Sequence, residues 1–502
     1  EEGYEIITEK QDDYEVKYLD KLPIAKLVST NIEYTDLQKA IDASTNGETI
    51  EILRNATIIS STPTFEVSEE KNITIDLKGY ILTRGNSILL NNKGSLTITD
   101  SGKGEENSKT YGKIENSGGA VINNNSGTLE INGVTITSGS TIITNNGSGT
   151  LEINNTTITS SSTAIVNNNT GNITINSGTI TGYNGINNAG TEKVIINGGS
   201  ILSAGGYHDA YASPILNSSS GTVEINKGTI RATDAYNQGI RNISTGKIII
   251  RDGTVNGSIN PGISNEKEGT LEISGGSIDQ INSSGTAIIT GGNITGGFGN
   301  SGTATITGGN ISGGYSAVSN GRNSTLTLGI KDGNVNKNNP VIIGYESGIS
   351  NEGTFNFYDG IISGTTDAVN GAIKEIEDGY EIISDTTDDG KKSKYLSRFP
   401  VAELESTGET YYTIQEAIDA VTQAKDTIKI IRMYTTLNTL STTTVPENKD
   451  IIIDLNGFKI EQNNEKFLIN NGTLKITDSS DNNAGIIYFG ANNLFENNGI
   501  MN

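Results

Sequence analysis

The sequence Gly127-Thr128-Leu129-Glu130-Ile131-Asn132-Gly133-Val134-Thr135-Ile136 returns at Gly149 as Gly-Thr-Leu-Glu-Ile-Asn-Asn-Thr-Thr-Ile. The same frame, Gly-Thr-apolar-x-Ile-x-x-Gly-x-Ile, recurs in degenerate form from Gly171, Gly190, Gly221, Gly246, Gly269, Gly285, Gly302 and Gly353. A frame that returns about every twenty residues, with insertions of variable length, is typical of a solenoid.

Alternating apolar residues within each repeat indicate strands rather than helices. Leu129 and Ile131 stand two residues apart, as do Val223 and Ile225, which is the period of a strand with one buried face. Branched side chains suit such positions, and the intervening Asn-Gly and Gly-Gly pairs suit tight turns. We therefore expect one buried column of isoleucines, formed by Ile131, Ile153, Ile175, Ile225, Ile250, Ile273, Ile289 and Ile306.

A third segment, apolar-x-Asn, closes each repeat. Its asparagines are Asn123, Asn145, Asn167, Asn188, Asn217, Asn242, Asn265, Asn300, Asn320 and Asn351. Their two-residue offset from a buried apolar residue predicts an inward ladder, in which each side-chain amide bonds to the amide of the next coil. The alternative is that asparagine only tolerates the turn geometry.

Three short strands in each repeat predict an all-β fold, a right-handed parallel β-helix whose coils are stable only when stacked. We expect roughly fourteen coils between Thr49 and Gly371, at about 4.8 Å per coil. Apolar residues at the open end of the first coil need a cover, which the amphipathic segments 36–43 and 413–420 supply as short capping helices. Thr413 and Glu416 have the spacing of a capping box.

The whole module also repeats. Gly3-Tyr4-Glu5-Ile6-Ile7 returns as Gly379-Tyr380-Glu381-Ile382-Ile383, and Pro23-Ile24-Ala25 returns as Pro400-Val401-Ala402. We divide the chain into a small β linker module (1–30), a helix-capped β-helix (31–376), a second linker module (377–405) and the truncated start of a second helix-capped β-helix (406–502). Tandem modules suit a protein that must be long.

Composition excludes several classes of function. The net charge is −23 and no basic cluster occurs, which argues against nucleic acid and anionic membranes as partners. No run of eighteen apolar residues is present, so we expect no membrane span. Cysteine is absent, which removes disulfides, thiolate metal sites and cysteine nucleophiles. We expect no metal site and no cofactor.

Together, the capping-helix sequence Thr413-Ile414-Gln415-Glu416-Ala417-Ile418-Asp419-Ala420, the Ile-Asp-Leu-Asn-Gly-Phe segment at 453–458 and the Gly-Thr-Leu-x-Ile coils resemble the right-handed parallel β-helix proteins of the pectate-lyase-like superfamily. With the Pro-(Ile/Val)-Ala linkers, the chain is similar to large repetitive cell-surface proteins of Gram-positive gut bacteria. The resemblance implies an extracellular, structural or adhesive module on a bacterial surface, with neighbouring modules of the same chain as partners.

Enzymes of that superfamily place acidic residues and a base on one outer face, so a polysaccharide lyase or glycoside hydrolase is the alternative function. The candidate region is 204–211, which contains the only histidine, His208, beside Asp209, one coil before Arg231. Because no second carboxylate stands on a neighbouring strand position, we expect no catalytic residue here. Ice binding is a third alternative, suggested by outward threonine pairs at 135–137, 157–159 and 179–181, but the grid ends after three coils.

A row of tyrosines is the candidate ligand-binding site. In several coils a tyrosine precedes the apolar-x-Asn segment by three or four residues, which would place the row along one corner of the stack. A tyrosine ring has a flat apolar face and a polar tip, so such a row could stack sugar rings of a glycan or a host or bacterial surface ligand. Together with their polar neighbours, the candidate residues are Tyr183, Tyr207, Asp209, Tyr211, Arg231, Asp234, Tyr236, Tyr315 and Tyr345. The alternative is that these tyrosines only cover the edges of the coils.

Overall fold

The structure is a computed structural model that describes residues 4–11, 14–102, 112–204, 212–234, 236–266, 268–432, 442–462, 468–481, 484–489 and 495–502. The chain forms two compact units. The first consists of Glu1–Leu326, Pro340–Thr354 and Ser363–Ala372, and the second of Thr327–Asn339, Phe355–Ile362 and Ile373–Asn502. Three strands contain residues of both units: β39 (Thr325–Leu328), β42 (Thr354–Phe357) and β43 (Ile361–Gly364).

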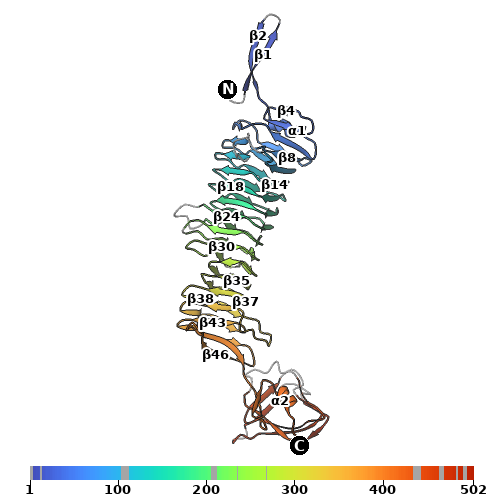
Figure 1. Ribbon diagram of the computed structural model, residues 1–502, viewed down its shortest axis with the longest axis vertical. Helices are drawn as coiled ribbons and strands as arrows, with labels where there is room; N and C mark the ends of the chain where they lie inside the picture. Colours follow the sequence, from blue (N-terminus) through green and yellow to red (C-terminus); the bar gives the residue numbers. More distant parts are fainter. Residues whose placement is uncertain are drawn as a thin grey trace. The chain divides into compact units, whose positions relative to one another are not determined.

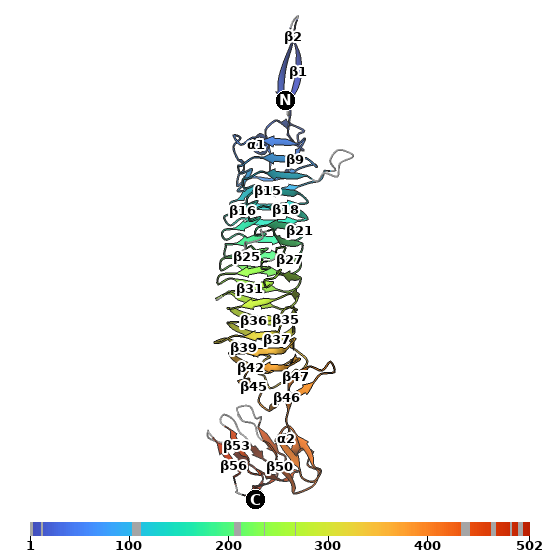
Figure 2. The ribbon, with the colours of Figure 1, turned by 90° about the vertical axis from the view of Figure 1, so that its left-hand side faces the viewer.

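Parallel strands of the first unit are stacked coil upon coil, as Figures 1 and 2 show. Their pairings divide them into three stacks, A, B and C. Stack A comprises β5 (Glu48–Ile52), β8 (Asn72–Asp76), β11 (Ser95–Thr99), β14 (Thr128–Asn132), β17 (Thr150–Asn154), β20 (Ile173–Ile175), β23 (Lys193–Ile196), β26 (Thr222–Ile225), β29 (Lys247–Ile250), β32 (Thr270–Ile273), β35 (Thr286–Ile294) and β37 (Thr303–Ser312). The ends of the long strands β35 and β37 also belong to stack B.

Stack B comprises β6 (Ala56–Ile58), β9 (Ile81–Arg84), β12 (Lys113–Asn116), β15 (Thr135–Ser138), β18 (Thr156–Ser160), β21 (Gly178–Gly182), β24 (Ser200–Ser203), β27 (Thr229–Ala232), β30 (Thr254–Asn256), β33 (Ser277–Ile278) and β40 (Val341–Ile343). Stack C comprises β7 (Phe65–Val67), β10 (Leu90–Asn92), β13 (Ile122–Asn124), β16 (Ile143–Asn145), β19 (Ile165–Asn167), β22 (Ile186–Asn188), β25 (Ile215–Asn217), β28 (Ile240–Asn242), β31 (Ile263–Asn265), β34 (Ile281–Ser283), β36 (Phe298–Asn300), β38 (Ser316–Asn320), β41 (Ser347–Asn351) and β44 (Asp367–Asn370).

Successive strands along the chain belong to stacks A, B and C in turn, as β14, β15 and β16 do. Stack C holds fourteen strands, which agrees with the predicted number of coils. This arrangement is consistent with the predicted parallel β-helix.

Buried apolar side chains alternate along the strands of the stacks and form the core. In stack A, Ile131 pairs in register with Ile153, and the same register continues coil by coil as far as Ile306. Every isoleucine of the predicted column is at most 1% exposed, and Ile196, which the prediction omitted, fills the one missing level. The predicted buried column is confirmed.

The asparagine ladder is also present, on the inner side of stack C. From Asn124 to Asn265 each side-chain Nδ2 donates to the Oδ1 of the asparagine on the next strand, at 2.8 to 3.0 Å. The ladder begins earlier than expected, at Asn92. It passes to Ser283 in β34, and a second run joins Asn300, Asn320 and Asn351.

The prediction for Asn123 is wrong by one residue. In that coil two apolar residues, Val121 and Ile122, stand side by side and both are fully buried, so the apolar-x-Asn frame could start at either. The structure uses Ile122, which places Asn124 in the ladder. Asn123 instead donates from its Nδ2 to Oδ1 of Asn91, 3.2 Å away, on the outer side.

The repeat glycine is explained by the ladder. Four residues after each of several ladder asparagines, the glycine carbonyl accepts a second bond from Nδ2, as from Asn167 to Gly171 at 2.9 Å. A Cβ on Gly171 would lie 2.0 Å from the carbonyl oxygen of Gly149 and 2.3 Å from Nδ2 of Asn145. The glycine is therefore required by close approach between coils rather than by an unusual φ angle.

A second ladder, which the sequence analysis missed, follows stack A on the outside. Asn154, Asn176, Asn197 and Asn226 each donate from Nδ2 to Oδ1 of the asparagine one coil earlier, at 2.8 to 2.9 Å. Its amides therefore donate in the direction opposite to those of the inner ladder. These side chains reach water, so we expect each bond to contribute less than its buried counterpart.

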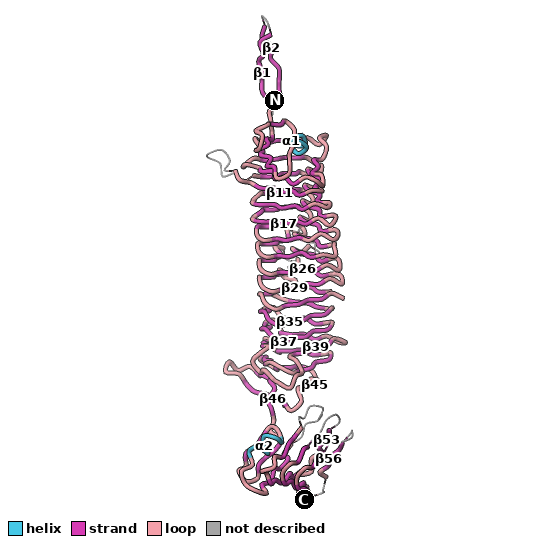
Figure 3. The backbone as a smooth tube through the Cα atoms, turned by 90° about the vertical axis from the view of Figure 1, so that its right-hand side faces the viewer, coloured by secondary structure: helices cyan, strands magenta, loops and turns pink. Residues whose placement is uncertain are grey.

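Two helices occur among the described residues, and each stands at the predicted place. Figure 3 shows α1 (Leu37–Ala43) beside the first strands of its unit. Asp36 caps α1, and Thr413 with Glu416 forms the predicted capping box of α2 (Ile414–Ala420). Their buried faces are formed by Leu37, Ala40 and Ile41 in α1 and by Ile414, Ala417 and Ile418 in α2.

A glutamine in each helix protects the edge of the first stack C strand. The side-chain amide of Gln38 donates to the carbonyl of Glu66 in β7 at 3.0 Å and accepts from its N–H at 2.7 Å, as a neighbouring strand would. Gln415 makes the same two bonds with Thr444 of β51 (Thr443–Val445). Each bond pair satisfies backbone groups that would otherwise offer an open strand edge.

A lysine holds the end of each helix. Nζ of Lys71 donates to the carbonyls of Asp42 and Ser44, at 2.8 and 2.6 Å. Nζ of Lys449 donates to the carbonyls of Asp419 and Val421 in the same way. A cation at the carboxyl end of a helix satisfies free carbonyls and favours the helix dipole.

The remaining strands of the first unit are the hairpin β1 (Tyr4–Gln11) and β2 (Tyr14–Lys21), followed by β3 (Ala25–Leu27) and β4 (Glu33–Tyr34). The second unit contains β45 (Glu375–Ile376), β46 (Tyr380–Thr386), β47 (Lys392–Arg398), β48 (Ala402–Leu404), β49 (Glu409–Tyr411), β50 (Asp426–Ile430), β52 (Asp450–Asp454), β53 (Lys459–Gln462), β54 (Leu468–Asn470), β55 (Thr473–Thr477), β56 (Ile486–Phe489), β57 (Phe495–Asn497) and β58 (Ile500–Met501). Parallel pairing of β50, β52 and β55 follows that of β5, β8 and β11, and Asn470 donates to Asn497 as in the inner ladder.

Candidate ligand-binding surface

Two exposed tyrosines meet on neighbouring coils of the first unit. The loops that enter β38 and β41 lie in register, because the N–H of Tyr345 donates to the carbonyl of Gly314 and the N–H of Glu346 donates to that of Tyr315, at 3.3 and 3.0 Å. Tyr315 is 69% exposed and Tyr345 is 75% exposed. These are the most exposed of the tyrosines in the predicted row that the structure describes.

Glu346 adds a charge to this pair. Its carboxylate accepts a hydrogen bond from the hydroxyl of Tyr315, and this bond, more than charge or burial, raises the pKa of Tyr315. This hydrogen bond orients the Tyr315 ring relative to the next coil. We name Tyr315, Tyr345 and Glu346 the tyrosine pair site. Glu346 was not among the predicted residues, because its role depends on the register between two coils rather than on a motif.

Tyr236 lies farther along the same corner. It is 47% exposed, and on the next coil Ile259 is 69% exposed. The side-chain amide of Asn260 donates to the carbonyl of Tyr236 and so joins the two loops. Four strand steps in stack C separate β28 from β38, a distance of about 19 Å. The predicted row is therefore interrupted between Tyr236 and the tyrosine pair site, since the loops between them carry no aromatic residue.

One acidic side chain lies between Tyr236 and the tyrosine pair site. Asp279 precedes β34, its Oδ1 accepts from the N–H of Gln280 at 2.6 Å, and burial raises the pKa of its carboxyl group. An added Cβ at Gly262 would lie 2.2 Å from that same oxygen, so the carboxylate is pressed against the preceding turn. These contacts with the backbone hold the Asp279 carboxylate within the turn rather than on the open surface.

The other predicted residues are placed as follows. Tyr183 is half-buried, and its N–H donates to the carbonyl of Ser162 at 2.8 Å. Arg231 is exposed on the outer face of β27, and Asp234 is half-buried in the turn that follows. Four predicted or discussed residues lie outside the described residues: Tyr207, His208, Asp209 and Tyr211.

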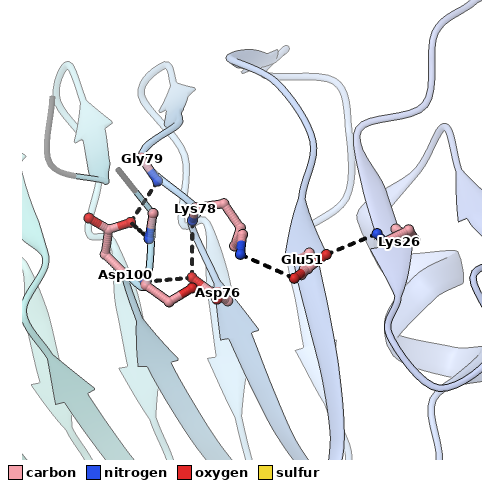
Figure 4. A network of polar contacts seen from close by, with 8 residues as sticks. Lys26, Glu51, Asp76, Lys78, Gly79 and Asp100 are labelled. Atoms are coloured by element: carbon pink, nitrogen blue, oxygen red, sulfur yellow. Dashed lines mark hydrogen bonds and ion pairs between the residues drawn. The ribbon is translucent and has the colours of Figure 1, made fainter. Parts of the chain in front are cut away.

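Acidic residues near the beginning of the stacks are engaged by backbone donors, as Figure 4 shows. Asp76 accepts from the N–H groups of Lys78 and Ser101, at 3.0 and 2.9 Å. Asp100 accepts from the N–H groups of Gly79 and Gly112, at 2.6 and 2.7 Å. The carboxylates therefore close the turn between stacks A and B.

The second unit repeats this arrangement. Asp454 accepts from the N–H groups of Asn456 and Ser479, and Asp478 accepts from those of Gly457 and Gly485. The bond from Gly485 is the largest of the effects that lower the pKa of Asp478. Carboxylates that are already bonded to several N–H groups are structural and poorly suited to proton transfer.

Nearby, Glu51 lies between two ammonium groups. Nζ of Lys26 is 3.0 Å and Nζ of Lys78 is 3.3 Å from its carboxylate, and the bond to Lys26 is the main cause of its lowered pKa. These ion pairs join β3, β5 and the turn after β8. In the described part of the chain, no group of three or more His, Cys, Asp or Glu residues is arranged to hold a metal ion.

Of the helices that the structure describes, none has the length and apolar character needed to span a bilayer. No protein-family model, no curated protein and no solved structure matches this chain.

Proposed function

We propose that this chain is a structural segment of an extracellular bacterial surface protein, in which tandem, helix-capped, right-handed parallel β-helix modules act as a spacer. The observation that carries the proposal is that one set of capping contacts occurs twice. Gln38 and Gln415 pair with a strand edge, and Lys71 and Lys449 hold the helix end. A chain that restarts the same capped stack is suited to extension by addition of modules.

The internal ladders support the same role. Each coil adds one level of buried apolar side chains, and most coils add a buried asparagine bond, so length is gained without a new kind of core. The resemblance to repetitive surface proteins of Gram-positive gut bacteria gives the proposed location, and neighbouring modules of the same chain are the proposed partners. Nothing in this role requires a cofactor.

Small-angle X-ray scattering on chains with one, two and three copies of residues 31–405 tests the spacer role. We expect the maximum dimension to rise by at least about 60 Å for each added copy, since thirteen strand steps of about 4.8 Å separate the first and last strands of stack C. Chains whose maximum dimension stops growing after the first copy would contradict a spacer.

The tyrosine pair site supports a second candidate function, adhesion to a glycan. Two rings that are 69% and 75% exposed, on loops one coil apart, offer flat apolar faces on which sugar rings can stack. Glu346 supplies a hydrogen-bond acceptor for a sugar hydroxyl. Exposed aromatic residues of this kind are enriched where proteins bind partners.

Binding of the full chain to a glycan array and to mucin-coated surfaces tests adhesion. We expect Tyr315→Ala with Tyr345→Ala to weaken binding at least about tenfold, which is about 1.4 kcal/mol. Tyr236→Ala is the matched control and should leave binding unchanged, because Tyr236 lies outside the tyrosine pair site. Equal binding by the double variant and the unaltered chain would exclude the tyrosine pair site as the binding site. If neither protein binds, adhesion is excluded and the spacer role is the one function that remains.

A further inference from the structure

The chain contains two hairpins with the same pairing. In the first, Ile6 faces Leu19 and Ile7 faces Tyr18 across β1 and β2. In the second, the equivalent pairs across β46 and β47 are Ile382 with Leu396 and Ile383 with Tyr395. Both are antiparallel, and each leads to a Pro-(Ile/Val)-Ala segment and a capping helix. The two hairpins are therefore equivalent elements in different surroundings.

The second hairpin has a docking partner within its own unit, the segment 327–339. The hydroxyl of Tyr380 donates to the carbonyl of Gly333 at 3.5 Å, and Nζ of Lys337 lies 5.4 Å from the centre of the Tyr395 ring. On the hairpin, Ser393 and Leu396 are only 3% and 2% exposed.

The residues that lead into this hairpin bind the same segment. Oε1 of Glu377 accepts from the N–H of Gly333 at 3.1 Å, and Nζ of Lys331 is 3.7 Å from the carboxylate of Asp378. Glu377 is 4% exposed, and its burial raises the pKa of its carboxyl group. Hairpin and lead-in together therefore contact the segment at Lys331, Gly333 and Lys337.

The first hairpin lacks such a partner among the described residues. There, β1 and β2 form a two-stranded sheet that pairs with no other described strand. Ile6 is 69% exposed, whereas its equivalent Ile382 is half-buried. An isolated two-stranded hairpin is only marginally stable in water, and its open edges are templates for pairing with another chain segment.

The side chains that dock the second hairpin have counterparts in the first. Tyr380 corresponds to Tyr4, Tyr395 to Tyr18, and the acidic pair Glu377-Asp378 to Glu1-Glu2. We propose that the hairpin β1–β2 is a docking element for the segment equivalent to 327–339 at the end of another copy of this β-helix module. The partner is thus a second copy of this chain's own module, recognised through tyrosine, lysine and carboxylate contacts.

This inference rests on the proposed modular role and names the contacts that would join one module to the next. Docking would fix the hairpin at both ends: to the module before it, and through residues 22–27 to the capping helix after it. A hairpin seated in this way also covers the last coil of the preceding module, which would otherwise present open strand edges.

The test is a chain in which a copy of residues 31–376 is added ahead of Glu1, so that residue 376 of the copy is joined to Glu1 as Ile376 is joined to Glu377. We expect amide hydrogen exchange in residues 4–21 to become at least about tenfold slower than in the unextended chain, approaching that of β46–β47. Exchange of β1–β2 that is unaffected, while the added copy shows the slow exchange of a folded stack, would overturn the proposal.

Two substitutions give the matched control. Lys331→Ala with Lys337→Ala in the added copy should speed exchange in β1–β2 and leave β46–β47 unchanged. The same two substitutions in the original copy should speed exchange in β46–β47 and leave β1–β2 unchanged. If the substitutions in the added copy leave exchange in β1–β2 unchanged, the result counts against docking, but it does not bear on the scattering test of the spacer role.

Discussion

Asn217→Ala is expected to lower the free energy of unfolding of the first unit by about 3–5 kcal/mol. Asn217 is fully buried, accepts from Nδ2 of Asn188 at 2.9 Å and donates to Oδ1 of Asn242 and to the carbonyl of Gly221, both at 2.9 Å. The substitution leaves three buried polar groups without this partner, and each such group costs about 1–3 kcal/mol. Urea-induced unfolding followed by circular dichroism measures the change.

Asn226→Ala is the matched control, because Asn226 directly follows β26 and belongs to the outer ladder. Its Nδ2 donates to Oδ1 of Asn197 at 2.9 Å, but Asn226 is only half-buried and Asn197 is exposed, so water can replace the bond. We expect a loss below about 1 kcal/mol. Comparable losses for the two variants would mean that burial does not set the strength of the ladder.

Short-range patterns were sufficient to predict the stacks. The two-residue alternation of Leu129 and Ile131 identified the inward face, and the position of Asn145 identified the ladder. Both features are local, because a strand places alternate residues on opposite faces whatever its neighbours are. The capping box at Thr413 could be predicted for the same reason.

Features that depend on register between coils could not be predicted in the same way. The tandem pair Val121–Ile122 gave two equally good frames, and only pairing with β10 and β16 selects Asn124 over Asn123. In β34 the sequence reads Ile281-Asn282-Ser283 instead of apolar-x-Asn, and only the register between strands shows that Ser283 takes the ladder position.

Contacts between segments distant in sequence were missed for the same reason. Gln38 bonds to a strand twenty-eight residues later, and Glu346 meets a tyrosine on the preceding coil. Aromatic residues near a corner could be predicted from sequence. The separation of Tyr236 from the tyrosine pair site could not, because it depends on how many coils lie between them.

Ile250→Ala should destabilise the first unit by about 2–5 kcal/mol, the usual range for truncating a fully buried isoleucine. Ile250 is fully buried and lies in register between Ile225 and Ile273. A cavity there cannot be filled by water without cost, and the isoleucines above and below are held by their own strand pairing. Urea-induced unfolding measures this change as well.

Ile249→Ala on the same strand is the control, since Ile249 points outward, is half-buried and lies between Glu224 and Glu272. It should cost less than about 1.5 kcal/mol, because only part of its apolar surface is removed from water. Nearest-neighbour coupling in a stack further predicts that faster amide exchange in Ile250→Ala is concentrated in β26, β29 and β32 and fades within a few coils. Equal losses at 249 and 250 would contradict the inward column, and uniformly faster exchange from β8 to β37 would contradict coupling limited to neighbouring coils.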